Sequence, residues 1–375
     1  MANTPPNKVR VLIVDDSAFM RKVLETILVS DQQLQVIGHA KDGREAIALA
    51  ESLKPDVITM DINMPHMDGL QATAQIMTTN PRPIVVVSSE SKDGAASTLK
   101  ALELGAIEFI AKPNSAIDLD MQSIREDLLR KVKMAAKVRV VRTASRFAAA
   151  LQSTSQNGAL VSRPAPVISR APSIPDQRFP VVVLAASTGG PATVMRLAPG
   201  FTKEFPAAVI LVQHMPAAFT TQFAAQLAEF TEIRVKEAES GDTIQPGCLY
   251  ICPGAQHLRV NPLGRIQLDS VSGRVGGYLP NIDVTMESVA AYGGALSIGV
   301  VLTGMGADGA QGAKAIKRAG GYVIAQDEAT SVIFGMPAEA IKLQAVDQVL
   351  GLDEIYSAIE KRVIALTRGT PVGVR

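Results

Sequence analysis

The chain has 375 residues, of which 47% are hydrophobic, and its 37 lysines and arginines nearly balance its 36 aspartates and glutamates. This length predicts two domains with ordinary cores, and the near-neutral charge argues against a nucleic-acid or membrane surface. Cys248 and Cys252 have no second pair, so neither a usual zinc site nor a disulfide framework is expected. The polar first ten residues do not resemble a signal peptide, and no apolar run reaches the roughly 20 residues that span a bilayer. We therefore expect a soluble cytoplasmic protein with no nucleic-acid partner and no membrane insertion.

Short apolar runs alternate with helical patterns over residues 8–131. Runs rich in valine and isoleucine predict strands, and apolar residues at helical spacing predict the helices between them. The predicted strands cover 9–14, 34–40, 55–60, 84–89 and 108–113, and the first two helices cover 17–29 and 44–53. This alternation favours a doubly wound parallel sheet.

Charged side chains stand at the ends of these predicted strands. Asp15 and Asp16 follow the first strand, Asp61 follows the third, and Lys112 lies at the end of the fifth. Because the carboxyl ends of parallel strands share one edge of the sheet, we expect the four to converge. Three carboxylates and a lysine suit Mg²⁺ binding and phosphoryl transfer to one carboxylate. A helix cap or a solvated strand end explains any single aspartate better but explains the set poorly.

This pattern resembles the receiver domain of two-component response regulators, which has a flavodoxin-like fold. The matching motifs are Asp15-Asp16, Asp61-Ile62-Asn63-Met64-Pro65-His66-Met67-Asp68-Gly69, Ser88 and Lys112-Pro113. The resemblance implies that a histidine kinase phosphorylates Asp61, that Lys112 pairs with the phosphoryl group, and that Ser88 is the switch hydroxyl. The Mg²⁺ ligands that it implies are Asp15, Asp16, Asp61 and the carbonyl of Asn63. Phe109 is the candidate for the aromatic residue that receivers usually carry before the lysine.

Residues 132–178 have the composition of a linker. Alanine, serine, arginine, glutamine and proline dominate, and four prolines lie between Ser162 and Pro175. Such a segment is typical of an extended, semi-rigid tether. Basic residues over 131–146 allow contact with an acidic partner, although a solvated helix followed by a tether explains them more simply.

The second predicted domain covers 179–370 and opens with the apolar run 179–186, which is typical of a strand buried on both faces. Ser187, Thr188, two glycines and Pro191 follow, a sequence that favours a tight turn into a helix. Ser187 then lies where open α/β sheets bind ligands and where amides can hold an oxyanion. Helix capping is the alternative role for Ser187 or Thr188. Further strands are predicted at 208–213, 246–251, 296–302 and 322–326, a hairpin at 257–268, and helices at 192–197, 219–230, 283–292 and 312–319.

Three predicted strand ends in this domain present Ser187, His214 and Asp308. A serine hydroxyl becomes a nucleophile when a base takes its proton, imidazole suits that task, and a carboxylate fixes the imidazole tautomer. The chain order Ser, His, Asp differs from the order in α/β-hydrolases, and Ala185 replaces the first glycine of their nucleophile elbow. A standard α/β-hydrolase is therefore disfavoured.

Spacing alone leaves other assignments open. His214 also fits a buried structural histidine, and Asp308 also fits a helix cap. His257 is a rival base. The rival acids are Asp283 and Asp327.

The second domain resembles the catalytic domain of the chemotaxis protein-glutamate methylesterases. The matching motifs are Ala186-Ser187-Thr188-Gly189-Gly190, Gln213-His214-Met215-Pro216 with Phe219-Thr220, Pro253-Gly254 with His257, and Leu302-Thr303-Gly304-Met305-Gly306-Ala307-Asp308-Gly309. The resemblance implies a Rossmann-like three-layer fold, with Ser187 as nucleophile, His214 as base, Asp308 as its orienting acid, and oxyanion contacts near Thr188 and Met305. Ala185 and Asn281 depart from the glycine and serine that the family commonly has. These departures leave the triad intact and bear on the target rather than the reaction.

A receiver joined by a linker to this catalytic domain implies a methylesterase of methyl-accepting chemoreceptors, with the same chemistry available for deamidating glutamine. The family also implies that the unphosphorylated receiver covers the active site, and that the esterase step needs no cofactor. A silent response regulator that acts only by docking is the alternative, although the intact Ser187, His214 and Asp308 argue against it. A nucleotide-binding module is weaker still, because the glycine turns lack the dinucleotide and P-loop patterns. The receptor, the signalling pathway, the oligomeric state and the degree of activation are open.

Overall fold

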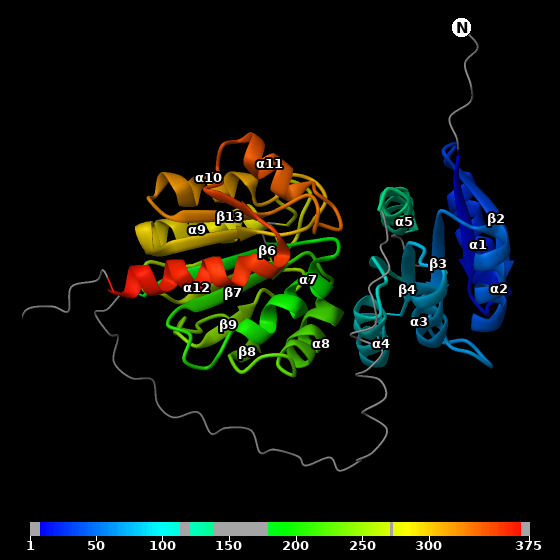
Figure 1. Cartoon of the computed structure of the whole chain (residues 1–375), viewed down its shortest axis with the longest axis horizontal. Helices are drawn as coiled ribbons and strands as arrows, with labels where there is room; N and C mark the ends of the chain where they lie inside the picture. The colour runs from blue at the N-terminus through cyan, green and yellow to red at the C-terminus, as the bar shows by residue number, and fades with distance from the viewer. Residues whose placement is uncertain (1–7, 90, 113–120, 139–178, 271–272, 369–375) are drawn as a thin grey trace, which may run out of the picture.

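The computed structural model describes residues 8–89, 91–112, 121–138, 179–270 and 273–368. Most of the predicted linker, from residue 139 to 178, lies outside the described residues, as does Pro113. The described residues form two α/β units, each built on its own parallel sheet (Figure 1). The predicted fold class, two doubly wound parallel sheets, is therefore confirmed.

The first sheet contains five parallel strands in the order β2-β1-β3-β4-β5. Its middle strands are buried because helices cover both faces, which explains their nearly continuous apolar sequences. The strands are β1 (Val9–Val14), β2 (Leu34–Ala40), β3 (Val57–Asp61), β4 (Ile84–Ser88) and β5 (Glu108–Ala111). The helices are α1 (Ala18–Val29), α2 (Gly43–Leu53), α3 (Gly69–Thr79), α4 (Lys92–Glu103) and α5 (Met121–Ala135). Helix α5 thus continues past residue 131, where the predicted receiver domain ends.

Side-chain caps fix where four of these helices begin. Ser17, Asp42, Asp68 and Ser91 each accept a hydrogen bond from a backbone amide in the first turn of α1, α2, α3 and α4. At the start of α3, a side chain on Gly69 would collide with the backbone carbonyl of Asp61. The α3 turn therefore packs directly on the end of β3.

The second sheet contains seven strands in the order β14-β13-β12-β6-β7-β9-β8, and every pair is parallel. The central strands β6 (Val181–Ala186), β7 (Ala208–Gln213) and β12 (Ser297–Val301) are wholly buried. The outer strands are β8 (Arg234–Glu237), β9 (Cys248–Ile251), β13 (Tyr322–Gln326) and β14 (Gln348–Leu350). The predicted hairpin is confirmed as a separate antiparallel pair, β10 (His257–Val260) with β11 (Ile266–Asp269).

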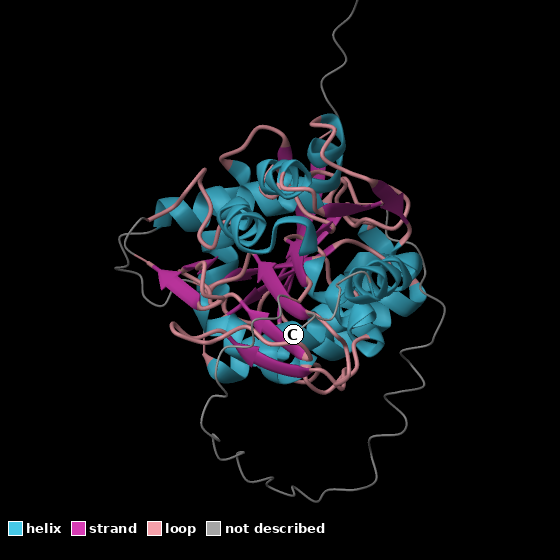
Figure 2. Ribbon diagram, turned by 90° about the vertical axis from the view of Figure 1, so that its left-hand side faces the viewer, coloured by secondary structure: helices cyan, strands magenta, loops and turns pink. Residues whose placement is uncertain are grey.

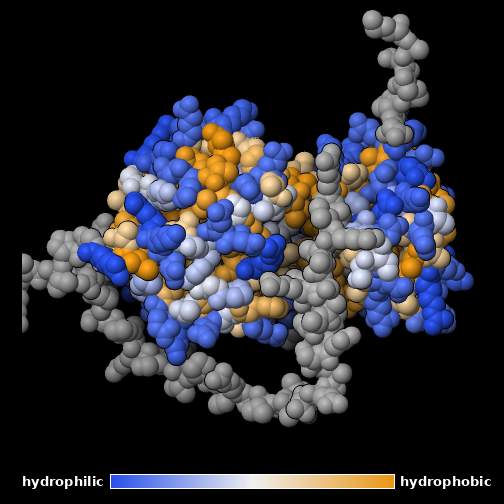
Figure 3. Space-filling view, viewed as in Figure 1, coloured by the Kyte–Doolittle hydropathy of each residue, from blue (hydrophilic) through white to orange (hydrophobic). Residues whose placement is uncertain are grey.

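Helices pack on both faces of this sheet, giving the three layers that the sequence predicted (Figure 2). The α-helices are α7 (Gly190–Leu197), α8 (Ala217–Leu227), α9 (Ile282–Gly293), α10 (Ala310–Arg318), α11 (Met336–Lys342) and α12 (Leu352–Arg368). Two short 3₁₀ helices, η1 (Ala198–Gly200) and η2 (Gly294–Leu296), follow α7 and α9. Hydrophilic and hydrophobic side chains are interspersed over the visible outer surface (Figure 3).

The two units touch through α4, β5 and α5 on one side and α7, α8 and the Met305 turn on the other (Figure 1). The ring of Phe109 at β5 packs against the ring of Phe219 in α8, with centroids 4.4 Å apart. Gln226 of α8 also donates a hydrogen bond to Glu103 of α4. Phe109 and Phe219 are both buried, so this contact excludes water from part of each surface.

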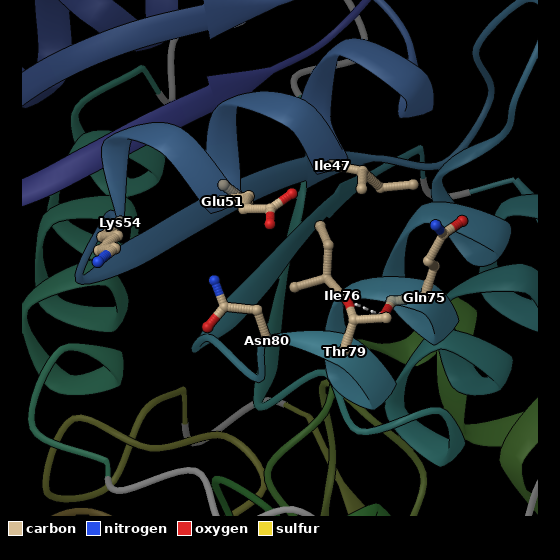
Figure 4. A pocket seen from close by; sticks show the side chains of 8 residues that line it. Ile47, Glu51, Lys54, Gln75, Ile76, Thr79 and Asn80 are labelled. Carbon is tan, nitrogen blue, oxygen red and sulfur yellow. Dashed lines mark hydrogen bonds between the residues drawn. The ribbon is translucent and has the colours of Figure 1, made fainter.

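A cavity of about 420 Å³ lies away from this contact, between α2 and α3 of the first unit (Figure 4). Its lining includes Glu51, Lys54, Gln75 and Asn80 and none of the residues that the sequence singled out. Among the described residues, no helix has both the length and the apolar character needed to cross a bilayer.

Candidate active site

The turn after β6 positions Ser187 at the carboxyl edge of the second sheet. Gly189 has a φ of 75°, a left-handed conformation that favours glycine. The amide of Gly190 donates to the Ser187 carbonyl at 2.8 Å, which closes the turn. The amide of Ser187 itself donates to the carbonyl of Thr303 at 3.0 Å, so it is tied to the neighbouring strand end.

Ser187, His214 and Asp308 form one hydrogen-bonded chain. The Nδ1 atom of His214 lies 3.1 Å from the Ser187 hydroxyl, and its Nε2 atom lies 2.8 Å from Oδ2 of Asp308. The three side chains follow β6, β7 and β12, which are adjacent in the sheet, so parallel topology brings them together. For Nδ1 to accept the serine proton, Nε2 carries hydrogen and donates to Asp308. This is the reverse of the ring orientation in chymotrypsin, where Nε2 faces the serine.

Asp308 is held as a carboxylate by backbone amides as well as by His214. Its Oδ2 atom accepts from the Ile282 amide at 2.8 Å, and its Oδ1 atom accepts from the amides of Asp283 and Gly309 at 3.0 Å each. Ile282 and Asp283 are the first residues of α9, where free amides and the helix dipole favour a negative charge. The arrangement therefore keeps a charged acceptor fixed behind the imidazole.

The rival residues occupy structural positions. His257 is fully buried, and both its ring nitrogens are engaged, with the Gly273 carbonyl at 2.7 Å and the Asn281 amide at 3.1 Å. Asp283 accepts from the Gly312 amide at 2.6 Å, and Asp327 accepts from the Thr330 amide and hydroxyl. None of the three bonds Ser187 or His214 among the described contacts.

Gln213 is a site residue whose role the sequence did not reveal. Its amide nitrogen donates to the Ser187 carbonyl at 2.8 Å and to the His214 carbonyl at 3.2 Å, which ties the two turns together. A side chain on Gly190 would collide with Gln213, so glycine there makes room for it. The signal was present in the Gln-His-Met-Pro motif, but a glutamine beside a histidine has no distinctive spacing.

Thr188 and Met305, the predicted oxyanion contacts, both flank Ser187 and both touch the first unit. The Thr188 hydroxyl donates to Glu108 at 2.9 Å, and Arg130 of α5 lies 4.0 Å from the Met305 sulfur. Side chains of the first unit therefore contact both turns that flank Ser187. The Ser187 amide is already bonded to the Thr303 carbonyl, so it does not point at a substrate in this arrangement.

The predicted acidic site also assembles at the carboxyl edge of the first sheet. Asp15, Asp16 and Asp61 present oxygens that all lie within 4.8 Å of one another. The amine of Lys112 lies 3.0 Å from Asp15 and 2.9 Å from Asp61. Burial raises the pKa of Asp61, although Lys112 acts in the opposite direction. Burial also opposes the charge on Lys112, but its ion pairs with Asp61 and Asp15 outweigh that effect and raise its pKa.

The remaining predicted receiver residues point elsewhere. Asn63 is exposed and lies two residues after Asp61. The Ser88 hydroxyl is buried and donates to the Gly94 carbonyl of α4 at 3.2 Å. Phe109 turns toward Phe219 of the second unit. Ser88 thus bonds α4, and Phe109 lies on β5, and both of these elements contact the second unit.

Comparison with known proteins covers both units of the chain. The family model for CheB methylesterase matches residues 182–359, and that for the response regulator receiver domain matches 11–124. A protein-glutamate methylesterase/protein-glutamine glutaminase of Pyrococcus abyssi is 42% identical over 368 residues, 98% of this chain and 96% of the relative. The chain belongs to the CheB methylesterase family.

Other members of the CheB family are similarly close. The protein-glutamate methylesterase/protein-glutamine glutaminase of Halalkalibacterium halodurans is 40% identical over 359 residues, covering 95% of this chain and 99% of the relative. The crystal structure of the Thermotoga maritima CheB methylesterase catalytic domain is 39% identical and covers 49% of this chain and 99% of that chain, with a TM-score of 0.48. The relatives thus span both units, so the family assignment holds for nearly the whole chain.

Proposed function

We propose that this protein hydrolyses glutamate γ-methyl esters on methyl-accepting chemoreceptors and that a histidine kinase controls it through Asp61. The observation that carries the proposal is the bonded chain Ser187–His214–Asp308 at the edge of three adjacent strands. The names of the close relatives supply the substrate class. The receiver domain supplies the link to a kinase.

The first half of the reaction forms an acyl-enzyme. The Ser187 oxygen attacks the ester carbonyl carbon while its proton passes to Nδ1 of His214. Asp308 stabilises the resulting imidazolium through Nε2. The carbonyl becomes an oxyanion, which the amides of Thr188 and Met305 stabilise. The carbon–methoxy bond then breaks, and His214 returns its proton to the departing methanol.

The second half restores the enzyme. Water attacks the acyl carbon and gives a proton to His214, and the bond to Ser187 then breaks as the serine regains its proton. The product is a receptor glutamate. A glutamine substrate follows the same path with ammonia in place of methanol, which accounts for the double name of the relatives.

Control by the receiver follows from the contacts over the site. Glu108 and Arg130 reach Thr188 and Met305, so the arrangement described here is the covered state. Phosphorylation of Asp61 places new charge beside Lys112 and offers Ser88 an acceptor other than Gly94. A rearrangement of α4 and β5 then shifts the population toward an open state.

A divalent cation fits the acidic site. The carboxylates of Asp15, Asp16 and Asp61, with the Asn63 carbonyl, are the hard oxygen donors that Mg²⁺ prefers. When bound, Mg²⁺ neutralises the charge of the phosphoryl group that Asp61 accepts. Lys112, already paired with Asp61, orients that carboxylate and holds a second positive charge beside it.

Methanol release from methylated receptor membranes tests the esterase directly. Ser187→Ala should lower release by at least about 10⁴-fold, because it removes the nucleophile. The matched control is Ser357→Ala, an exposed serine on α12 that should leave release unchanged. Equal methanol release by wild type and Ser187→Ala would contradict the proposal. No methanol release by any form would favour a silent response regulator that acts only by docking.

A further inference from the structure

One aromatic residue outside the bonded chain lies directly on the catalytic imidazole. The ring of Tyr278 stacks on the ring of His214, with centroids 4.5 Å apart and planes only 10° from parallel. Near-parallel rings at this distance are in van der Waals contact over their faces. His214 is thus held at its edges by Ser187 and Asp308 and on one face by Tyr278.

The hydroxyl end of Tyr278 reaches the turn that carries Met305. A side chain on Gly306, whose φ is 88°, would collide with the Tyr278 oxygen. Tyr278 therefore extends from the imidazole face to the turn beside Ser187. Glycine at position 306 leaves the space that this close approach needs.

Tyr278 lies on a small hairpin with internal hydrogen bonds. The amides of Val275 and Tyr278 donate to each other's carbonyls at 3.0 Å, around Gly276 and Gly277, which have φ of 58° and 88°. Asn281 adds a bond from its side-chain amide to the Val275 carbonyl at 3.1 Å. Gly276 and Gly277 supply the left-handed conformations that such a two-residue turn requires.

His257 fixes both ends of this hairpin. It bonds the Gly273 carbonyl through Nε2 and accepts the Asn281 amide through Nδ1, and it is fully buried. An imidazole that donates at Nε2 and accepts at Nδ1 is neutral. The residues that follow, Ile282 and Asp283, donate to Asp308. One short segment therefore positions both the ring stacked on His214 and the acid behind it.

We infer that Tyr278 is a positioning residue for His214 and that His257 acts through it, a role that rests on the proposed function. The Tyr278 ring blocks rotation of the imidazole, so Nδ1 stays aimed at Ser187 through repeated proton transfers. The electron-rich ring face also favours the imidazolium that forms in the transition state. Both effects lower the barrier to chemistry without requiring contact with the receptor.

Steady-state methanol release by the full chain, with a small phosphodonor present, tests this inference. Tyr278→Leu should lower kcat by between about 10-fold and 100-fold and leave KM within about twofold. Tyr278→Phe keeps the stacked ring and should retain kcat within about threefold. Tyr322→Leu, which removes a tyrosine ring from β13, is the matched control and should behave as wild type.

Any of three results would overturn the inference. The first is a wild-type kcat for Tyr278→Leu, and the second is an equal loss of kcat in Tyr278→Leu and Tyr278→Phe. The third is a Tyr278→Leu variant in which KM changes and kcat does not. If release does not depend on Ser187 either, the proposed function itself fails, so the two failures are distinguishable. A double-mutant cycle of Tyr278→Leu with His257→Gln tests whether His257 acts through Tyr278. We expect the loss of kcat in the double variant to be smaller than the product of the two single losses, whereas losses that are additive in free energy would contradict a role of His257 through Tyr278.

Discussion

At the scale of single residues, the proposed mechanism requires Asp308 as the hydrogen-bond acceptor behind His214. Its three backbone donors and His214 all point at carboxylate oxygens. Asp308→Asn replaces one carboxylate oxygen by an amide NH2 group, which donates and cannot accept the proton of Nε2, so the imidazole tautomer is no longer fixed. We expect kcat for methanol release to fall by about 10⁴-fold with the fold preserved.

The matched control for Asp308→Asn is Asp353→Asn, because Asp353 is an exposed carboxylate whose ion pair among the described residues is with Arg196. Circular dichroism of both variants checks the fold. Activity of Asp308→Asn within tenfold of wild type would remove Asp308 from the proposed mechanism.

Asp283 makes a second residue-scale prediction, on stability. Burial, with the nearby charge of Asp308 adding to it, raises the pKa of Asp283 to about 6, although the Gly312 amide acts against this. The folded protein therefore binds a proton that the unfolded chain has released between about pH 4 and pH 6. Protonated Asp283 therefore adds to the free energy of unfolding below about pH 4, and this contribution is lost as the pH rises through about 6.

Asp283→Asn removes this pH-dependent loss of stability, because asparagine does not ionise, and its side-chain oxygen can still accept from the Gly312 amide. The raised pKa corresponds to at most about 3 kcal/mol, which partial exposure of the side chain reduces to about 1–2 kcal/mol. We expect the variant to melt above wild type at pH 7.5 and at the same temperature at pH 4. Thermal melting of both proteins between pH 4 and pH 7.5 checks this prediction. A difference in melting temperature that does not change with pH would mean that the titration of Asp283 is not its cause.

At the scale of elements, apolar runs predicted the central strands well. The prediction of a strand over 208–213 matches β7, because a strand buried on both faces is continuously apolar. β8, with the sequence Arg-Val-Lys-Glu, was missed because an edge strand tolerates charged residues. The predicted final strand at 322–326 is followed by one more strand, the three-residue β14. Two helices that were not predicted, α11 and α12, also follow it.

In the candidate site, too, the sequence predicted the residues that follow apolar strands and missed the contacts made by irregular segments. Ser187, His214 and Asp308 each follow a predictable strand, so parallel topology alone suggested their convergence. Tyr278 lies in a glycine-rich hairpin with no periodicity, and its contact with His214 depends on tertiary packing. The Phe109–Phe219 contact joins two domains and has no local sequence signal.

The packing of β5 against the active-site turn makes an element-scale prediction. Glu108→Ala removes the acceptor of the Thr188 hydroxyl, and Phe109→Ala removes the ring packed on Phe219. Each should raise methanol release in the absence of phosphodonor, by about tenfold for every 1.4 kcal/mol by which it destabilises the covered state. Glu45→Ala, on α2 far from the second unit, is the control. Unchanged release in both β5 variants would show that this packing does not restrain the enzyme.

At the scale of the whole molecule, the proposed function requires coupling between two sheet edges. One edge carries Asp61 and Lys112, and the other carries Ser187 and His214. Ser88 bonds α4, and Glu108 of β5 bonds Thr188, so the proposed function gives a charge added at Asp61 a short structural route to the residue next to Ser187. Regulation requires that this cover open when Asp61 is phosphorylated.

The measurement that tests this coupling most directly is the initial rate of methanol release from methylated receptor membranes, with and without a small phosphodonor and Mg²⁺. Wild type and Asp61→Asn are compared at equal concentration. We expect the same low basal rate for both and stimulation of wild type alone. Equal stimulation of Asp61→Asn, or no stimulation of a wild type shown to be phosphorylated, would contradict control through Asp61.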